Sequence, residues 1–205
     1  MSGHDDDHEH HHDHDHEGHD HDHEGHDHDD EARERAARRQ IALAQVRQYG
    51  DPVLRMPANE VESFDEELES LAGRMIALMH DADGIGLAAT QVGIVRRMFV
   101  FSNEGEDTVV VNPVLTPKGK DTEVDEEGCL SLGAVRMPVE RSVKVTLDGV
   151  DVHGEPLHLE LEGLPARVVQ HEADHLDGRL IIDRTDPESR REAMAQLRPR
   201  LILSR

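Results

Sequence analysis

A short stretch near the carboxyl end of the chain combines side chains that can bind a metal ion with one that can act as a base. The segment Gln170–Gly178 has the sequence QHEADHLDG. Side chains four positions apart on an α-helix project only about 40° from one another, so His171 and His175 can reach one ion. Glu172 would lie beside that ion and could accept a proton from a water molecule there. The stretch therefore predicts a catalytic metal site that still needs a third ligand.

Three parts of the chain are candidates for that ligand. Metzincins place a third histidine just after the helix, but this chain has Ile181 there. A glutamate on a later helix, as in gluzincins, could only be Glu188 or Glu192, both in an arginine-rich segment. Cys129 is the only cysteine, so it cannot form an internal disulfide. Its thiolate would complete a Cys/His/His set and leave the fourth position open for water, as catalytic sites require.

Two further motifs narrow the choice. Gly84–Gln91 has the sequence GIGLAATQ, which lacks the lysine of a phosphate-binding P-loop. Glu127–Ser131 has the sequence EGCLS and contains the lone cysteine. Together with the helix segment, these motifs resemble the three motifs of peptide deformylases, GxGLAAxQ, EGCLS and QHExxHLxG. All three are complete and in family order, and the resemblance covers roughly residues 46–187.

The resemblance implies a metal-dependent hydrolase that removes the N-formyl group from the formyl-methionine at the start of new polypeptides and releases formate. The Cys/His/His set would hold the metal. Glu172 would take a proton from the attacking water and later deliver it to the leaving nitrogen. Gln91, through its side-chain amide, and Leu130, through its backbone N–H, match the family positions that donate to the tetrahedral oxyanion.

The glycines of these motifs suit an extended peptide that lies along the backbone. Gly84, Gly86 and Gly128 remove side chains where such a peptide would pass, which is typical of strand addition. By resemblance, Ile85, Gly86 and Gly128 are the main-chain partners of the substrate. Glu127 would instead hold the loop or a metal ligand.

Specificity for methionine requires an apolar pocket. Val168 and Leu164 lie one and two turns before His171, on roughly the same helix face, so we assign both to that pocket; the alternative is ordinary core packing. Arg136 and Arg167 could line its rim or be surface charges.

Asp174 is a second acidic residue on the metal helix, and the pattern predicts that its carboxylate is buried. A buried carboxylate needs a partner, and Arg141 is one possibility.

The choice of metal is a separate inference. A Cys/His/His set with water is common for zinc, whereas the resemblance favours Fe(II), one ion per catalytic site, with Zn, Ni or Co as substitutes. Ligand types alone do not decide, because the affinity order favours zinc over iron while cellular supply also matters.

Four helices would position these residues. We expect them near 31–48, 64–81 and 165–177, and from Asp186 until Pro199 ends the last one. The pair Ser63 and Glu66 matches a capping box. After it, apolar residues recur at helical spacing and should be core: Leu68, Leu71, Met75, Leu78 and Met79. Pro165 suits the first turn of the metal helix, and Gly178 suits its C-terminal cap.

Strands occupy the middle of the chain. Runs rich in β-branched residues, some of them alternating with polar ones, predict strands near 97–102, 108–112, 121–126, 134–139, 142–150 and 156–162. The first two flank an acidic turn and should form a hairpin. We therefore expect an α+β fold, with antiparallel strands packed around the central HExxH metal helix and with N- and C-terminal helices.

Composition divides the 205 residues into a tail, 1–30, and one catalytic domain, 31–205. The net charge is −23, but residues 31–205 carry 32 acidic and 22 basic side chains, which indicates an ordinary acidic domain and excludes a nucleic-acid-binding surface. No apolar run approaches the about 20 residues that span a membrane. The absence of a signal-peptide pattern and the single unpaired cysteine favour a cytoplasmic location.

The tail contains 12 His and 13 Asp or Glu, without Lys or Arg. The heptapeptide HDHDHEG occurs twice in His12–Gly25, and a third copy begins at His26. Such a segment cannot form a core, so we expect disorder. The interleaved acids favour native sequence over an expression tag. Imidazole and carboxylate density predicts weak, multivalent binding of Zn, Ni, Co or Fe; the alternative is a pH-responsive solubility tail.

The last helix is rich in arginine. It contains four arginines, Arg190, Arg191, Arg198 and Arg200, but only two glutamates, Glu188 and Glu192. Deformylases act at the ribosome exit tunnel, so this helix could dock on RNA there. A solvated helix face is the interpretation that we favour.

Two other classes of protein share some of these features. A zinc peptidase with the same HExxH helix would cleave internal peptide bonds and would not need Cys129. A non-enzymatic metal-handling protein would bind many ions per chain and would not need Glu172. Neither accounts for the glycine loop, Gln91 or the Glu127–Ser131 motif.

Overall fold

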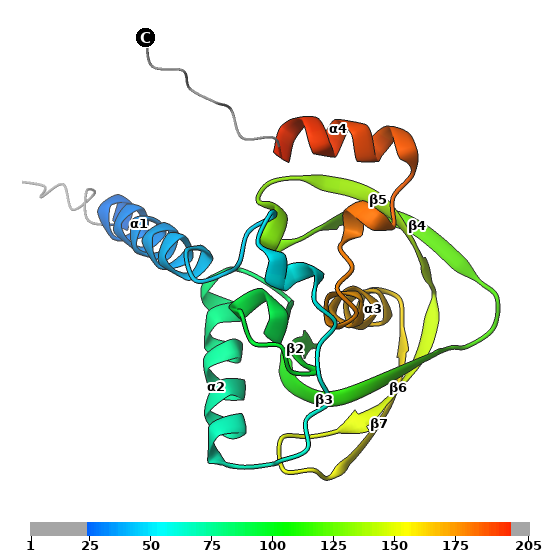
Figure 1. Ribbon diagram of the computed structural model, residues 1–205. Helices are drawn as coiled ribbons and strands as arrows, with labels where there is room; N and C mark the ends of the chain where they lie inside the picture. The colour runs from blue at the N-terminus through cyan, green and yellow to red at the C-terminus, as the bar shows by residue number, and fades with distance from the viewer. Residues whose placement is uncertain (1–23, 198–205) are drawn as a thin grey trace, which may run out of the picture. The chain divides into compact units, whose positions relative to one another are not determined.

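Helix α3 (Leu164–Leu176) lies between a five-stranded and a two-stranded sheet in the computed structural model, which describes residues 24–197 (Figure 1). The larger sheet has the order β1-β2-β3-β6-β7 and is antiparallel throughout. Its strands are β1 (Gly86–Ala88), β2 (Met98–Asn103), β3 (Glu106–Pro117), β6 (Lys144–Val150) and β7 (Pro156–Glu162). The smaller sheet pairs β4 (Thr122–Gly128) with β5 (Arg136–Ser142). The predicted α+β class is confirmed.

All six predicted strands are present within a few residues of their expected bounds, and β2 and β3 form the expected hairpin. The alternating apolar side chains of β2 explain its position, because Phe99 and Phe101 bury one face of the strand against Val168 and its neighbours on α3. Strand β1 was not predicted. Its three residues follow directly on the glycine-rich segment and leave too short a run for a recognisable strand pattern.

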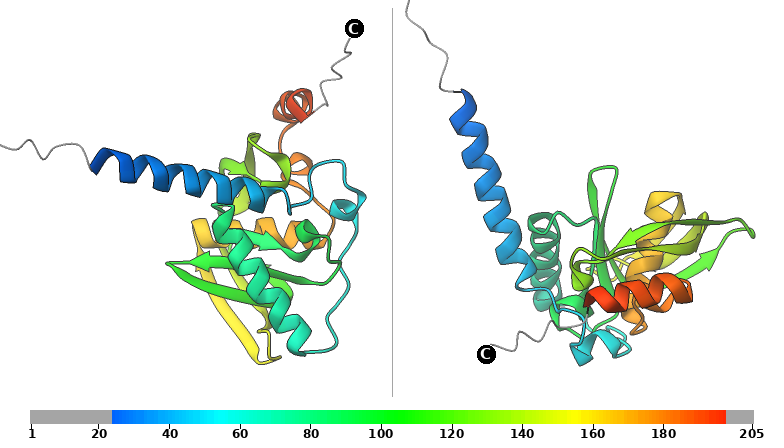
Figure 2. Two further views of the ribbon diagram at one scale, coloured as in Figure 1. Left: turned by 90° about the vertical axis from the view of Figure 1, so that its left-hand side faces the viewer. Right: turned by 90° about the horizontal axis from the view of Figure 1, so that it is seen from above.

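Helix α2 (Glu66–Asp81) packs against β1 and β2 through its predicted apolar stripe (Figure 2). The capping box at Ser63 is wrong. The N-cap is Asp65, whose Oδ1 accepts a hydrogen bond of 3.0 Å from the Leu68 backbone N–H. A carboxylate directly before the first turn satisfies one of the N–H groups that have no acceptor within the helix, so the helix begins after Asp65.

Helix α3 has both predicted terminal features. Pro165 stands in its first turn, where no backbone N–H is needed. Gly178 follows the last turn with φ of +69°, and the next amide, of Arg179, donates to the carbonyl of Asp174 at 2.8 Å. A Cβ at Gly178 would lie 2.6 Å from the carbonyl oxygen of Arg55, so glycine is required for conformation and for space.

The terminal helices are α1 (Glu24–Leu43) and α4 (Pro187–Leu197). Helix α1 begins and ends earlier than the predicted range 31–48. The carboxylate of Asp186 accepts from the backbone N–H of Glu188 and Ser189 and so starts α4 as expected. Most of the His-rich tail, and Pro199, lie outside the described residues. Within the described part of the chain, no helix is both long and apolar enough to cross a membrane.

Candidate metal centre and substrate cleft

The three predicted ligands come together. One ligand atom from each of Cys129, His171 and His175 lies within 4.8 Å of the other two, and Cys129 Sγ is 3.3 Å from His175 Nε2. All three side chains are buried. Residues on α3 supply the histidines, and the turn between β4 and the short helix η3 (Leu130–Leu132) supplies the cysteine. No other such cluster occurs among the side chains described, residues 30–197, which rules out the alternative ligands Glu188 and Glu192 there.

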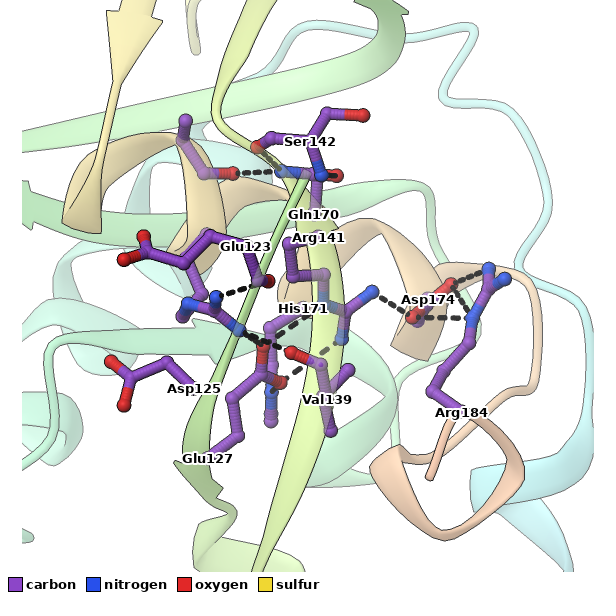
Figure 3. A network of polar contacts seen from close by, with 12 residues as sticks. Glu123, Asp125, Glu127, Val139, Arg141, Ser142, Gln170, His171, Asp174 and Arg184 are labelled. Carbon is purple, nitrogen blue, oxygen red and sulfur yellow. Dashed lines mark hydrogen bonds and ion pairs between the residues drawn. The ribbon is translucent and has the colours of Figure 1, made fainter. Parts of the chain in front are cut away.

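Glu127 fixes the orientation of His171. Its Oε2 lies 3.0 Å from His171 Nδ1, and the carboxylate also accepts hydrogen bonds of 2.9 and 3.0 Å from the buried Arg141 (Figure 3). A second buried arginine, Arg167, donates to the same carboxylate at 2.9 Å. Burial raises the pKa of Glu127, but the hydrogen bonds and charges of His171 and Arg141 outweigh it and lower the pKa to about 2. An ionised carboxylate at Nδ1 leaves Nε2 of the imidazole for a metal.

Asp174 extends this buried network along α3. Its Oδ2 accepts from Arg141 Nη1 at 2.6 Å and from Arg184 Nε at 3.0 Å (Figure 3). The predicted burial of Asp174 and its pairing with Arg141 are confirmed, and Arg184 is a partner that the sequence did not suggest. Arg141 therefore connects Glu127, which contacts the metal ligand His171, with Asp174. Asp174 in turn contacts Arg184, in the segment that leads to α4.

Glu172 is buried beside the ligand cluster. Among the described residues, its Oε2 has no hydrogen-bond partner. Burial raises the pKa of Glu172 to about 7, a rise that the neighbouring His171 offsets only in part. Gly86, on β1, faces this carboxylate so closely that a Cβ there would lie 2.9 Å from Glu172 Cδ. Glycine is therefore needed at position 86 partly because a Cβ would meet the Glu172 side chain. The predicted need to leave space for the substrate is a separate reason.

The side-chain amide of Gln91 has a fixed orientation. Its Oε1 accepts from the Ala88 backbone N–H at 2.9 Å, and its Nε2 donates to Ser131 Oγ at 3.2 Å. The same nitrogen lies 3.7 Å from Cys129 Sγ. The amide NH₂ group therefore faces the ligand cluster. Leu130 begins a short helix, so its N–H belongs to the first-turn donors that have no acceptor within the helix.

A cavity of about 550 Å³ opens beside the ligand cluster. Every predicted substrate-binding residue lines it: Ile85, Gly86, Gly128, Leu164 and Val168. Their burial differs, because Val168 is buried whereas Ile85 and Leu164 are 49% and 62% exposed. An apolar lining of this kind would suit an unbranched apolar side chain.

Two further lining residues were predicted as rim or surface charges. Arg167 is buried and also donates to the backbone carbonyls of Val139 and Glu123, so it is not a surface charge. Arg136 is exposed and donates to the Glu126 carbonyl at 2.9 Å.

Several lining or supporting residues were missed from the sequence. Ser131 contacts the Gln91 amide, and Arg39, Leu43 and Asp83 line the cavity. Ser131 lies inside a recognised motif and could have been found there. The other three lie outside every motif and carry no local signal.

Comparison with known proteins gives a consistent result. A family model described as polypeptide deformylase matches residues 43–191. The chain is similar to peptide deformylase 1 of Corynebacterium glutamicum, with 45% identity over 162 residues, which are 77% of this chain and 96% of the relative. It is 49% identical over 146 residues to a peptide deformylase of Thermotoga neapolitana, covering 71% of this chain and 89% of that one. A crystal structure of the enzyme from Synechococcus elongatus in complex with actinonin matches with a TM-score of 0.71 and 41% identity, over 74% of this chain and 84% of that chain.

Proposed function

The chain belongs to the polypeptide deformylase family, and on this premise we propose a role for each residue of the site in removing the N-formyl group from nascent peptides. The reaction is hydrolysis of a formamide: water adds to the formyl carbon, the C–N bond breaks, and formate and a free amino terminus are released. This reaction requires a metal cation, a base that takes a proton from water, hydrogen-bond donors to the oxyanion, and a cleft that holds an extended peptide.

The Cys/His/His cluster fits a divalent cation. Its three ligand atoms converge from two elements, and the neighbouring Glu172 Oε2 is a buried acceptor for which no described residue is a partner. When bound, the ion supplies Lewis acidity toward water and the formyl oxygen. We propose Fe(II) as the working metal, one ion per site, with Zn, Ni or Co as substitutes, because thiolate and imidazole ligands suit all of these ions.

Glu172 is the proposed general base and acid. Its carboxylate accepts a proton from the attacking water and passes that proton to the nitrogen as the C–N bond breaks. Burial raises the pKa of Glu172, which favours its holding the proton between the two transfers. This position of Glu172, buried beside the ligand cluster, is the single observation that carries the proposal.

Gln91 Nε2 and the Leu130 backbone N–H are the proposed donors to the oxyanion. The amide of Gln91 is oriented by its contacts with Ala88 and Ser131, and preorganised donors typically contribute about 3–4 kcal/mol. Leu130 supports the same role because it starts a helix beside Cys129.

The extended peptide is proposed to lie in the cavity along Ile85, Gly86 and Gly128, with its methionine side chain against Leu164 and Val168. The carbonyl of Ile85 accepts from the Ser102 backbone N–H at 3.0 Å and is thus used by the sheet. Other main-chain atoms of these residues would then form the contacts with substrate.

The test is formate release from formyl-Met-Ala-Ser by anaerobically purified protein, beside Glu172→Gln. We expect release by the wild type and its loss, by at least about 100-fold, in the variant while one metal ion per domain stays bound. Full activity of Glu172→Gln would remove the assignment of the base. No formate from either protein, with metal bound, would favour the metal-handling alternative.

Three further proposals depend on the sequence rather than on the site. The cytoplasm is the proposed compartment, since a lone, unpaired Cys129 suits a reducing environment. The tail of residues 1–30 is proposed to bind additional divalent ions weakly through its 12 histidines. The last helix is proposed to be a solvated face rather than a ribosome-docking surface; co-sedimentation with ribosomes that disappears when residues 187–205 are deleted would contradict this.

A further inference from the structure

One residue that lines the cavity precedes the family match. Arg39 lies in the last two turns of α1 and lines the cavity together with Leu43 and Asp83. The family model begins only at residue 43. None of the steps proposed above uses Arg39, so its place in the cavity wall has no explanation in the hydrolysis itself.

Arg39 is held in place without being neutralised. Asp83 Oδ1 accepts hydrogen bonds from Arg35 Nε at 3.1 Å and Nη2 at 2.6 Å, which already balances the carboxylate charge. Arg39 Nε lies 3.3 Å from the other oxygen, Oδ2, and among the described residues Asp83 is its one ion-pair partner. Two guanidinium groups on one carboxylate leave a positive charge at the cavity. The Arg39 side chain is 48% exposed, and its Nη groups remain available to a ligand.

A third arginine adds to this positive charge. Arg136 is exposed, lines the cavity and, within the described chain, bonds to a backbone carbonyl rather than to a carboxylate. Asp83 and Glu126 line the cavity together with Arg39 and Arg136, and Asp83 is already paired with Arg35, which is not part of the lining. Because Arg35 balances Asp83, the guanidinium groups of Arg39 and Arg136 give a local excess of positive charge over Asp83 and Glu126, which would attract acidic side chains to a chain whose net charge is −23.

The distance from the reaction centre fits the first residues of a peptide. Gly86 faces Glu172, and Asp83, the partner of Arg39, stands three residues before Gly86 in the chain. Three residues of extended chain span at most about 10 Å. A peptide whose formyl group lies at Glu172 would therefore bring its second or third residue to the region of Arg39.

We propose that Arg39 makes this enzyme select formylated peptides that carry an acidic side chain at their second or third residue. The selection rests on the proposed deformylase site and adds a specificity-determining residue to it. A partly exposed ion pair has a modest effect, so kcat/KM should rise about 2–5-fold for an acidic side chain over its neutral isostere. The change should be in KM, because the contact lies far from the bond that breaks.

The test compares metal-loaded wild type with Arg39→Gln and with Arg38→Gln, a control that removes one positive charge from the neighbouring position of the same helix. The substrates are the pairs formyl-Met-Glu-Ser with formyl-Met-Gln-Ser, and formyl-Met-Ala-Glu with formyl-Met-Ala-Gln. We expect a glutamate preference in at least one pair for the wild type and Arg38→Gln, and a ratio near one for Arg39→Gln. The pair that shows it identifies the residue recognised.

Four outcomes would overturn the proposal. The wild type could show no glutamate preference, or Arg39→Gln could retain it, or Arg38→Gln could lose it equally, which would indicate a diffuse field. A fourth contrary result is an equal loss of kcat/KM for glutamine and glutamate peptides in Arg39→Gln, since Arg39 would then only support the wall. Formate release from the glutamine peptides by the wild type reports separately on the deformylase activity.

Discussion

Glu127 gives the clearest prediction at the scale of single residues. Its carboxylate contacts His171 and is shared by two buried arginines, so Glu127→Gln removes a charge that orients a ligand and leaves both arginines without it. We expect metal affinity to fall about 10–100-fold. Stability should also fall by about 3–5 kcal/mol, because a buried ion pair loses one partner. Competition with a metal chelator and urea unfolding measure the two effects.

Glu126→Gln is the matched control, since the neighbouring Glu126 side chain is exposed on the same strand. It should change metal affinity less than twofold. Equal affinity of Glu127→Gln and the wild type would show that Glu127 does not orient His171.

Asp174→Asn tests the other end of the network. It removes the carboxylate between Arg141 and Arg184 but leaves the contact between Arg141 and Glu127. We expect a stability loss of about 3 kcal/mol and a smaller loss of metal affinity than in Glu127→Gln. Asp177→Asn, at a more exposed pair with Arg97, should cost at most about 1 kcal/mol. Unchanged metal affinity in Asp174→Asn would leave Asp174 with a purely structural role.

The residues of the site could largely be predicted because they occur in short, local motifs. His171, Glu172 and His175 share one helix, and the lone Cys129 stands in a motif of its own. Arg184 could not be predicted. Its contact with Asp174 depends on how the segment after α3 turns back, and nothing in the local pattern fixes that path.

At the scale of elements, Gly86 shows how strand β1 and helix α3 depend on one another. A Cβ at this position would overlap the Glu172 carboxyl group, whose flexible end would move aside. In Gly86→Ala we therefore expect a small change in stability but a loss of about 100-fold in kcat, since a shift of about 1 Å in a reacting group can cost that much. Formate release under single-turnover conditions measures it.

Gly73→Ala is the control, because a Cβ at this exposed position of α2 meets no atom within 4 Å. It should raise stability by up to about 1 kcal/mol through better helix propensity and leave kcat unchanged. Normal kcat in Gly86→Ala would mean that Glu172 finds its working position with a side chain opposite.

How well each helix or strand could be predicted depends on whether its sequence signal lies within the element itself. Helix α3 and strand β7 (Pro156–Glu162) follow from proline, glycine and alternation patterns, and their bounds are nearly as predicted. The start of α2 was misplaced because Ser63 and Asp65 are both good caps, and only the Asp65 contact with Leu68 decides between them. Strand β1 is held by pairing with β2, a long-range contact that a three-residue segment does not reveal.

At the scale of the whole molecule, the His-rich tail and the catalytic domain should be separable in function. The matched family region begins at residue 43, and every residue of the proposed reaction lies within that region. Deleting residues 2–30 should leave kcat and KM of pre-metallated enzyme within about twofold, because no catalytic group is lost. The same deletion should remove most of the weakly bound Zn or Ni per chain in equilibrium dialysis, while the single tightly held ion at Cys129, His171 and His175 remains.

The direction of each change distinguishes the roles that the tail could have. A tail that serves only for solubility predicts unchanged ion binding after deletion and lower solubility near the pH at which its histidines protonate. A tail that loads the catalytic site predicts that the shortened apo-enzyme regains activity more slowly at low metal concentration, although its final activity is the same. A lower kcat of the pre-metallated, shortened enzyme would contradict both, because it would place part of the tail in the catalytic machinery.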